Sequence, residues 1–307
     1  MKEIILDCDP GIDDAMAIIY LASCRSVDIR AICTIMGNAS LDTCTNNALF
    51  LKEKFRLTTS VHRGSSHCIN GAEPHSFPYR VHGRNGLGDA IPINTGLRCD
   101  SLPAYIAMSR LALQSPKKIT ILALGQLTNL AVAMLSQKEF SKSLNEVIFM
   151  GGSLNLPGNV TAWAEANIYG DPEAADIVLR SGVPVTMIGL DVTMKTLISE
   201  SFLKDLTLRL GDLGKFLKQI NDFYASYYTQ GDHGYGFPMH DPLAALFLTN
   251  PELFVRKKGQ LSVVKNGKER GRTLFKVDNN GHHTVCVDVD VQKALDLFKQ
   301  NILNKYS

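Results

Sequence analysis

The chain has 307 residues, of which 45% are hydrophobic, and its formal net charge at pH 7 is +2. This length allows a large buried core, and the near-neutral charge without a Lys/Arg-rich run argues against a nucleic-acid partner. The seven cysteines are scattered and never spaced C-x-x-C, which argues against a disulfide framework and a zinc site. Neither a membrane span nor a signal peptide is recognisable, so we predict one cytoplasmic domain over residues 1–307 with no membrane partner.

Short apolar runs rich in β-branched residues alternate with longer amphipathic stretches along the chain. The apolar runs are predicted strands buried on both faces, and they lie at residues 4–6, 29–35, 119–124, 147–150 and 183–190. Amphipathic helices are predicted between them, for example at residues 102–113 and 127–135. This order is typical of βαβ units, so we predict an α/β fold with a mostly parallel, open Rossmann-like central sheet flanked by helices.

Two stretches, residues 64–96 and 231–238, are dense in glycine, proline and polar residues and are predicted loops. Loops of this length in a compact domain are more often functional than idle. Open α/β sheets bind ligands beyond the carboxyl ends of their strands. The segments 7–14, 37–38 and 151–152 each follow a predicted strand, so we expect the active site where these three segments meet.

The first of these segments, DCDPGIDD at residues 7–14, holds four carboxylates. Carboxylates so close together raise one another's pKa unless a cation or hydrogen-bond donors compensate them. An EF-hand loop does not fit, because Gly11 and Ile18 stand at two ligand positions, and the lysine of a P-loop is missing. A haloacid dehalogenase-like phosphatase would use Asp7 as nucleophile and Asp9 as acid over magnesium, although Gly11 departs from that pattern.

The simplest alternative to a metal site is a solvated turn in which Asp13 or Asp14 caps a helix over residues 15–22. A cap needs only one carboxylate. Asp9, Asp13 and Asp14 around a Pro-Gly turn can instead present oxygens to one hard cation, while the helix N-terminus offsets part of their charge. The sequence therefore favours the metal site.

A second polar group is MHDP at residues 239–242, where His240 and Asp241 precede an apolar helical stretch. The chain repeats the Asp-Pro dipeptide at Asp171, which we interpret as a plain helix cap. Asp241 differs because an imidazole and a carboxylate leave the backbone side by side after a glycine-rich loop. One of the two could hold a metal while the other reaches a substrate.

A third polar group follows the predicted strand that ends at Met150. Asn159, Glu165 and Asn167 lie there among Ala, Trp and Ile residues. Two amides and a carboxylate are suitable partners for hydroxyl groups, each of which donates and accepts hydrogen bonds. The group is consistent with a sugar pocket or, residue by residue, with turn-forming Asn and a solvated Glu.

Together these motifs resemble those of the inosine-uridine-preferring nucleoside hydrolases. The resemblance runs from about residue 3 to the C-terminal strand region, and it is carried by DCDPGIDDAMAI, MGNAS, GQLTNLA, MGGS…GN…AEANIYGDPEAA and MHDP. It implies an enzyme that holds one calcium ion in the acidic segment and hydrolyses the N-glycosidic bond of ribonucleosides, in nucleoside salvage. A homotetramer or homodimer is expected from the same resemblance.

The resemblance also implies roles for particular residues. The Ca²⁺ ligands would be Asp9, Asp14, Asp241 and the main-chain carbonyl of Leu124, with Asp7 as a support. The substrate-binding residues would be Asp13, Asn38, His82 near the base, Met150, Asn159, Glu165 and Asn167. Asp9 would take the proton of the attacking water, and His240, titrating near neutral pH, would donate a proton to the base. Tyr224 and Tyr228 could stack on the base or relay a proton to it.

Some features stay open at this point. His62, His67 and His75 have no counterpart in the family pattern, and we interpret them as surface or loop residues rather than a second metal site. The base could be uracil, cytosine or hypoxanthine. The alternatives from other classes are the magnesium phosphatase and a calcium-dependent nucleoside-binding protein without turnover.

Overall fold

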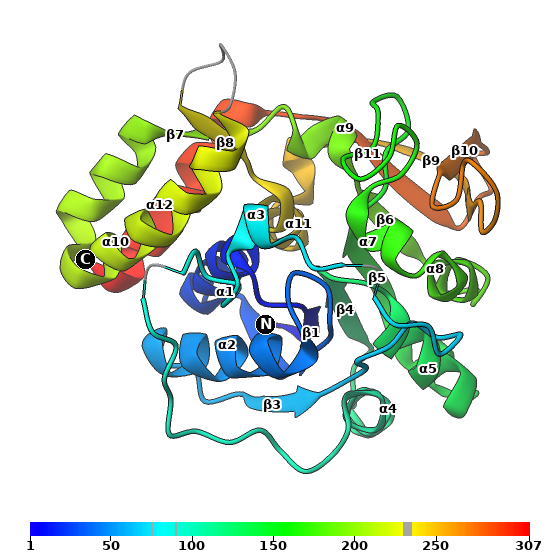
Figure 1. Cartoon of the computed structure of the whole chain (residues 1–307). Helices are drawn as coiled ribbons and strands as arrows, with labels where there is room; N and C mark the ends of the chain where they lie inside the picture. Colours follow the sequence, from blue (N-terminus) through cyan, green and yellow to red (C-terminus); the bar gives the residue numbers. More distant parts are fainter. Residues whose placement is uncertain (75, 90, 230–234) are drawn as a thin grey trace.

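The computed structural model of the chain describes residues 1–74, 76–89, 91–229 and 235–307. Its main feature is a nine-stranded sheet with the order β10-β9-β11-β6-β5-β4-β1-β2-β3 (Figure 1). The strands are β1 (Lys2–Cys8), β2 (Val27–Thr34), β3 (Ser60–Arg63), β4 (Ile119–Ala123), β5 (Leu144–Met150), β6 (Val185–Ile188), β9 (Phe254–Val263), β10 (Thr273–Val277) and β11 (His283–Val289). All neighbouring pairs are parallel except the two that involve β9. The predicted mostly parallel α/β fold is therefore confirmed.

Helices cover both faces of the sheet (Figure 1). One face carries α1 (Ile12–Ser23), α2 (Leu41–Lys54), α10 (Glu200–Tyr228), α11 (His240–Thr249) and α12 (Val291–Tyr306). The other carries α4 (Ala104–Gln114), α5 (Thr128–Ser136) and α8 (Pro172–Leu179). Alternate residues of β1 enter different cores, since Ile4 and Leu6 pack with the first set of helices and Ile5 with the second. Burial on both faces explains why the strands read as continuous apolar runs.

Short elements gather beyond the carboxyl ends of the strands. They are α3 (Tyr79–His82), α7 (Ala166–Gly170), α9 (Leu190–Thr193) and the hairpin of β7 (Leu197–Ser199) with β8 (Gly236–Pro238), while α6 (Phe140–Ser143) and the 3₁₀ helix η1 (Pro251–Leu253) connect other elements. Two loop predictions need correction, because residues 64–96 contain α3 and residues 236–238 form β8. Phe237 is buried edge-on against the Tyr224 ring, with the centroids 5.4 Å apart, and this contact outweighs the flanking glycine and proline. Residues 231–234 of that predicted loop lie outside the described residues.

The remaining predictions about histidines and cysteines are partly confirmed. All seven cysteines are free thiols, as the scattered spacing predicts. His67 is exposed and contacts Glu73, whereas His75 lies outside the described residues. The surface prediction is wrong for His62, which is buried in β3 with its ring against the Ser60 hydroxyl and the Leu102 carbonyl. Across the described ranges, no helix has both the length and the apolarity of a membrane span.

Candidate active site

The acidic segment leads directly from β1 into α1. The helix begins at Ile12 with Gly11 at its N-cap, so Asp13 and Asp14 lie inside the first turn. The Asp14 carboxylate accepts the Gly11 N–H at 2.9 Å and the Asn38 side-chain amide at 3.0 Å. The alternative of a helix capped by Asp13 or Asp14 and starting at residue 15 is wrong, because the helix starts one turn earlier. Its N-terminal dipole therefore lies under both carboxylates and offsets part of their charge.

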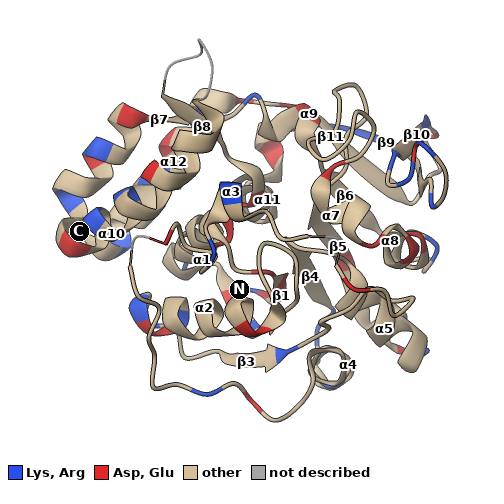
Figure 2. Cartoon of the chain, in the orientation of Figure 1, with Lys and Arg blue, Asp and Glu red and all other residues tan. Residues whose placement is uncertain are grey.

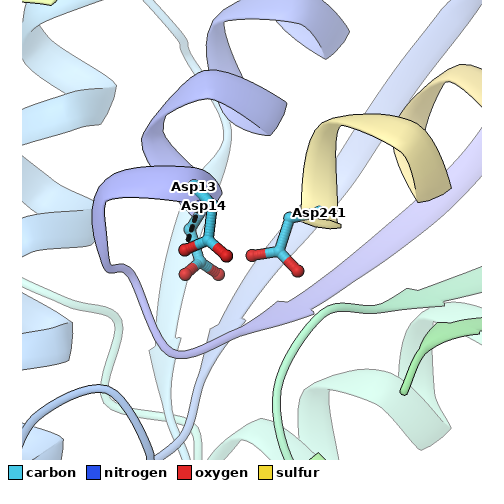
Figure 3. Close-up of side chains that lie close together, drawn as sticks. All are labelled: Asp13, Asp14 and Asp241. Atoms are coloured by element: carbon cyan, nitrogen blue, oxygen red, sulfur yellow. Dashed lines mark hydrogen bonds between the residues drawn. The ribbon is translucent and has the colours of Figure 1, made fainter. Parts of the chain in front are cut away.

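Asp241 reaches the same place from the first turn of α11. Figure 3 shows its carboxylate directed toward those of Asp13 and Asp14, which come from α1. One carboxylate oxygen from each residue lies within 4.8 Å of the others. Asp14 and Asp241 are buried and Asp13 is nearly so, and Asp14 Oδ1 has no hydrogen-bond partner. Segments more than 200 residues apart in the chain thus bring three acidic groups together.

Burial raises the pKa of each carboxyl group in this cluster, and neighbouring negative charge adds to the effect at Asp14 and Asp241. Burial raises the pKa of Asp13 to about 6 and that of Asp14 to about 7, the latter helped by the charge of Asp13. The pKa of Asp241 is raised well above its ordinary value by burial and by the neighbouring aspartates. In the part of the chain that the structure describes, no Lys or Arg lines the adjoining cavity. Many basic residues lie on outer helices and the β9–β10 hairpin, and α3 beside the cavity carries the exposed Arg80 (Figure 2). The donor set of hard oxygens fits a divalent cation as the missing compensation.

Asp9 lies beside this cluster and is not among the three residues that converge most closely. Its Oδ2 accepts the Asn38 N–H at 2.7 Å, and its buried Oδ1 has no partner. Burial, followed by the charge of Asp14, raises its pKa well above the ordinary value. Side chains at Gly37 or Gly125 would collide with its carboxylate, so two glycines leave room for it. The structure thus groups Asp13 with Asp14 and Asp241, where the sequence predicted Asp9 in that set.

The other predicted metal positions have clear partners. The Leu124 carbonyl accepts the side-chain N–H of Asn167 at 2.6 Å, and the same amide reaches the Met150 carbonyl at 3.1 Å. Asn167 therefore ties together the ends of β4 and β5. Asp7 is buried below the cluster, where its Oδ1 accepts from Asn129 at 2.8 Å and burial raises its pKa to about 7. This position agrees with a supporting role for Asp7.

A cavity of about 580 Å³ opens above the acidic cluster, within the usual range for small-molecule sites. Twelve predicted site residues line it, namely Asp13, Asn38, His82, Leu124, Met150, Asn159, Glu165, Asn167, Tyr224, Tyr228, His240 and Asp241. Asp9 and Asp14 do not line this cavity. The prediction that segments from separate strands meet at the carboxyl edge thus agrees with the observed positions.

Buried carboxylates hold the loop after β5, although the middle of this loop is exposed to solvent. Glu165 caps α7 and accepts the N–H groups of Gly152, Asn167 and Ile168. The alternative of a solvated Glu165 is wrong, since this side chain is buried and its pKa is raised by burial. The Asn159 side chain accepts the Ala166 N–H at 2.9 Å.

Sequence reasoning missed a second clamp on the same loop. Asp191 in α9 accepts the N–H groups of Leu154 and Asn155, each at 2.8 Å, as well as the Asn155 side chain. An acidic residue soon after a predicted strand was the available signal. Nothing in the sequence indicated which loop it would contact.

Side chains from three elements form a hydrogen-bonded chain along the cavity wall. Tyr224 donates to Asp13 at 3.3 Å, its hydroxyl lies 3.4 Å from that of Tyr228, and Tyr228 lies 3.2 Å from His240 Nε2. The other ring nitrogen of His240 lies 2.9 Å from the hydroxyl of buried Thr193, a partner that the sequence did not reveal. The prediction that His240 titrates near neutral pH is wrong for this site, because burial lowers its pKa to about 3. The free imidazole is therefore neutral.

His82 from α3 packs against the Tyr224 ring, with the ring centroids 5.4 Å apart. Its Nδ1 accepts the Ile12 N–H at 3.2 Å. A backbone N–H can only donate, so the neutral ring carries its proton on Nε2. Burial lowers the pKa of His82 to about 3, which leaves a fixed hydrogen-bond donor beside the cavity.

An open α/β sheet with buried carboxylates at its carboxyl edge, beside a cavity lined by amides, histidines and tyrosines, defines a small-molecule enzyme of the doubly wound class. The sequence profile of the family described as inosine-uridine preferring nucleoside hydrolase matches residues 4–296. The chain belongs to this family, and it is a ribonucleoside hydrolase. Family membership excludes the phosphatase alternative.

Relatives with assigned names agree in class and differ in the base. Uridine nucleosidase 1 of Arabidopsis thaliana is 36% identical over 89% of this chain and 82% of its own length. Pyrimidine-specific ribonucleoside hydrolase RihA of Citrobacter koseri is 33% identical over 97% of both chains.

Solved structures show the same fold over nearly the whole chain. The plant nucleoside hydrolase PpNRh1 superposes with a TM-score of 0.94 at 34% identity, over 98% of this chain and 99% of its own. The purine-preferring ribonucleoside hydrolase from Gardnerella vaginalis gives a TM-score of 0.94 at 33% identity, over 99% of this chain and 98% of its own.

Proposed function

We propose that this ribonucleoside hydrolase is calcium-dependent and cleaves uridine, cytidine and inosine to free base and ribose. The convergence of Asp13, Asp14 and Asp241 below a cavity lined by sugar-binding side-chain types supports this most directly. Relatives named for uridine, for pyrimidines and for purines give support for a broad choice of base. Uridine is the first substrate to test.

The ligands of the ion would be Asp9, Asp14, Asp241 and the Leu124 carbonyl, with Asp13 at the border between ion and sugar. Two unpartnered buried oxygens, Asp9 Oδ1 and Asp14 Oδ1, support this assignment because buried acceptors without partners are costly. Calcium takes about six to eight oxygen ligands, so this set leaves room for ligands from ribose and water. When bound, the ion would supply Lewis acidity toward water and hold the 2′- and 3′-hydroxyls of the ribose.

The chain's own carboxylates would carry the chemistry at the sugar. Asp9 would take a proton from water as the water attacks C1′, because its buried Oδ1 has no hydrogen-bond partner in the protein and is free to accept. The ribose becomes oxocarbenium-like as the C1′–N bond breaks, and the surrounding carboxylates stabilise its positive charge. Asn38, Asn159, Asn167, Glu165 and Met150 would position the ribose.

Neutral imidazoles and phenols would bind the leaving base. His82 donates a hydrogen bond from Nε2, because its Nδ1 is occupied by the Ile12 N–H. Negative charge that develops on the base raises the pKa of the neighbouring His240, which then takes the hydroxyl proton of Tyr228 and passes it to the base. Tyr228 would regain a proton from Tyr224, and Tyr224 would regain one from solvent after the base has left. Tyr224 links this chain to Asp13 and packs against His82.

The test is hydrolysis of uridine and inosine by the purified protein, followed as released reducing sugar with and without chelator. Turnover that chelator removes and calcium restores supports the proposal. Asp9→Ala should abolish turnover of every riboside, and substantial residual turnover would contradict its role as base. Binding of uridine without any release of ribose would identify the non-catalytic binding protein instead. The cytoplasmic location, the homotetramer or homodimer, and the salvage role stay predictions.

A further inference from the structure

A second cavity, of about 170 Å³, adjoins the nucleoside cavity on its sugar side. Asn38, Pro78, Val160, Ala166 and Asn167 line both cavities and form the partition between them. This second cavity is called the Asp9 cavity below, because Asp9 lines it and does not line the nucleoside cavity.

The side chains that would face the base are all on the other side of the partition. His82, Tyr228 and His240 line the nucleoside cavity and not the Asp9 cavity. The proposed base catalyst and the proposed leaving-group partners therefore face separate compartments.

The Asp9 cavity contains buried polar atoms without partners. Gln126 lines it with only 7% of its surface exposed, and its Oε1 has no hydrogen-bond partner. Asp9 Oδ1 is likewise without a partner. Buried polar groups are normally satisfied by protein or by ordered water, and each water needs about 30 Å³ of liquid volume. The cavity thus has both the space and the acceptors for several water molecules.

Two glycines keep this space open. A side chain at Gly37 would collide with Asp9, and a Cβ at Gly170 would lie 2.5 Å from the Gln126 side-chain amide. Neither glycine has a positive φ, so the backbone itself does not require glycine at these positions. The absence of side chains at Gly37 and Gly170 instead preserves the volume between Asp9 and Gln126.

We propose that the Asp9 cavity is the site from which water enters the reaction, separate from the entrance used by the nucleoside. Each turnover consumes one water, and a bound nucleoside occupies the larger cavity, which could otherwise supply that water. Water that attacks from the Asp9 cavity approaches C1′ on the face opposite the leaving base, as displacement with a general base requires. This inference rests on the proposed function, because it takes Asp9 as the general base.

The step balances as a hydrolysis. The water oxygen forms a bond to C1′ while the C1′–N bond breaks, and one water proton passes to Asp9. The bonding electron pair leaves with the base, which receives a proton from the His240 side. Gln126 would act as a positioning residue that orients the water through its free Oε1.

Two substitutions narrow the Asp9 cavity from opposite ends. Ser76 is exposed and lines the cavity, so Ser76→Trp obstructs its solvent end. Gly170→Ala pushes the Gln126 amide into the interior. Ser66→Trp is the matched control, because Ser66 is an exposed serine of the same loop region that lines neither cavity.

Both narrowing variants should lower kcat by about fivefold or more, with KM and the calcium-induced rise in Tm nearly unchanged, because water supply enters the rate after binding. The loss should be equal for uridine and for nitrophenyl riboside, since both need the same water. Ser66→Trp should leave kcat unchanged. Folding of each variant is checked by its Tm without calcium.

Unchanged kcat in both folded variants would overturn the water route. A rise in KM at constant kcat would also overturn it, because that result would assign the Asp9 cavity to nucleoside binding. These outcomes differ from failure of the proposed function. In that case the wild-type protein would release no ribose, or Asp9→Ala would stay active.

Discussion

The chain contains two Asp-Pro helix starts that look alike in sequence and differ completely in surroundings. At α8, Asp171 accepts hydrogen bonds from the Ala174 and Ile69 N–H groups and from the Thr128 hydroxyl. At α11 the N-cap is Met239, so Asp241 lies inside the first turn and faces Asp13 and Asp14 instead. Hydrogen-bond donors of the protein compensate the Asp171 carboxylate, whereas the Asp241 carboxylate lies among like charges.

This difference separates structural from functional carboxylates. Like charges held together in a buried place destabilise the protein unless a cation compensates them. A buried carboxylate with three donors stabilises the fold without any ligand. Substitutions at the two positions should therefore have effects of opposite sign on stability and unequal effects on activity.

The largest effect is expected from Asp241→Asn, which should lower kcat/KM for uridine by roughly 10³-fold or more, because metal binding and transition-state charge stabilisation are lost together. The metal-free protein should melt at a higher temperature than wild type, since a buried like charge is removed. Steady-state kinetics and thermal melting in chelator measure the two effects.

Asp171→Asn is the matched control. It should lower stability by about 1–3 kcal/mol through lost hydrogen bonds, with activity and calcium response retained. If the stability of the metal-free protein rises in both variants, or falls in both, the inferred difference between Asp171 and Asp241 is contradicted.

His240 comes directly before Asp241, whereas Gly170 precedes Asp171. We expect His240→Asn to lower kcat for uridine and inosine by about 10²-fold or more, as for loss of a general acid. Nitrophenyl riboside should lose far less, because its leaving group needs no proton. Parallel assays of both substrate types decide this, and equal losses would remove His240 from the acid role.

The raised pKa values predict a pH-dependent response to calcium. The folded-state pKa values of Asp13 (about 6) and Asp14 (about 7) lie above the ordinary value of 3.8. At pH values between the ordinary and the raised pKa, the metal-free native state therefore binds more protons than the unfolded chain. Its stability should fall as pH rises from about 4 to about 7. Calcium binds the ionised carboxylates, so the rise in Tm that calcium causes should be larger at about pH 8 than at about pH 5. A calcium effect independent of pH would contradict the assignment of the ion to this cluster.

Periodicity and charge predict much of this molecule from the sequence. The predicted strands lie on β1, β2, β4, β5 and β6, because parallel strands buried on both faces leave an uninterrupted apolar signature. Four aspartates within eight residues repel one another, which destabilises the protein unless a cation compensates them. The cluster therefore indicates a cation site.

Long-range packing sets the features that the sequence did not predict. Burial of His240 against Thr193 and Tyr228 lowers its pKa, and the local sequence has no sign of that desolvation. Glu165 looked like a free polar group because its partners are backbone N–H groups, which every residue offers. Asp191 lies in no motif, and Gln126 lies in GQLTNLA without a predicted role of its own, because the partners of both come from distant parts of the chain.

The smallest effects should come from the two buried threonines that hold the two helix starts. Thr128 donates to Asp171 at 2.7 Å, and the Thr193 hydroxyl lies 2.9 Å from His240 Nδ1. Thr193→Val keeps the shape and removes the partner that fixes the imidazole, so kcat for uridine should fall by about three- to tenfold with KM little changed.

Thr128→Val removes a hydrogen bond to a carboxylate that has two other donors, so it should cost about 1–2 kcal/mol of unfolding free energy and leave kcat unchanged. Denaturant unfolding and kinetics on both variants measure this difference. The unfolding free energy should fall only for Thr128→Val, and kcat should fall only for Thr193→Val. If Thr193→Val loses stability as Thr128→Val does while kcat is retained, then the hydroxyl at α11 is structural like its counterpart. The difference between the two helix starts would then be confined to Asp241 itself.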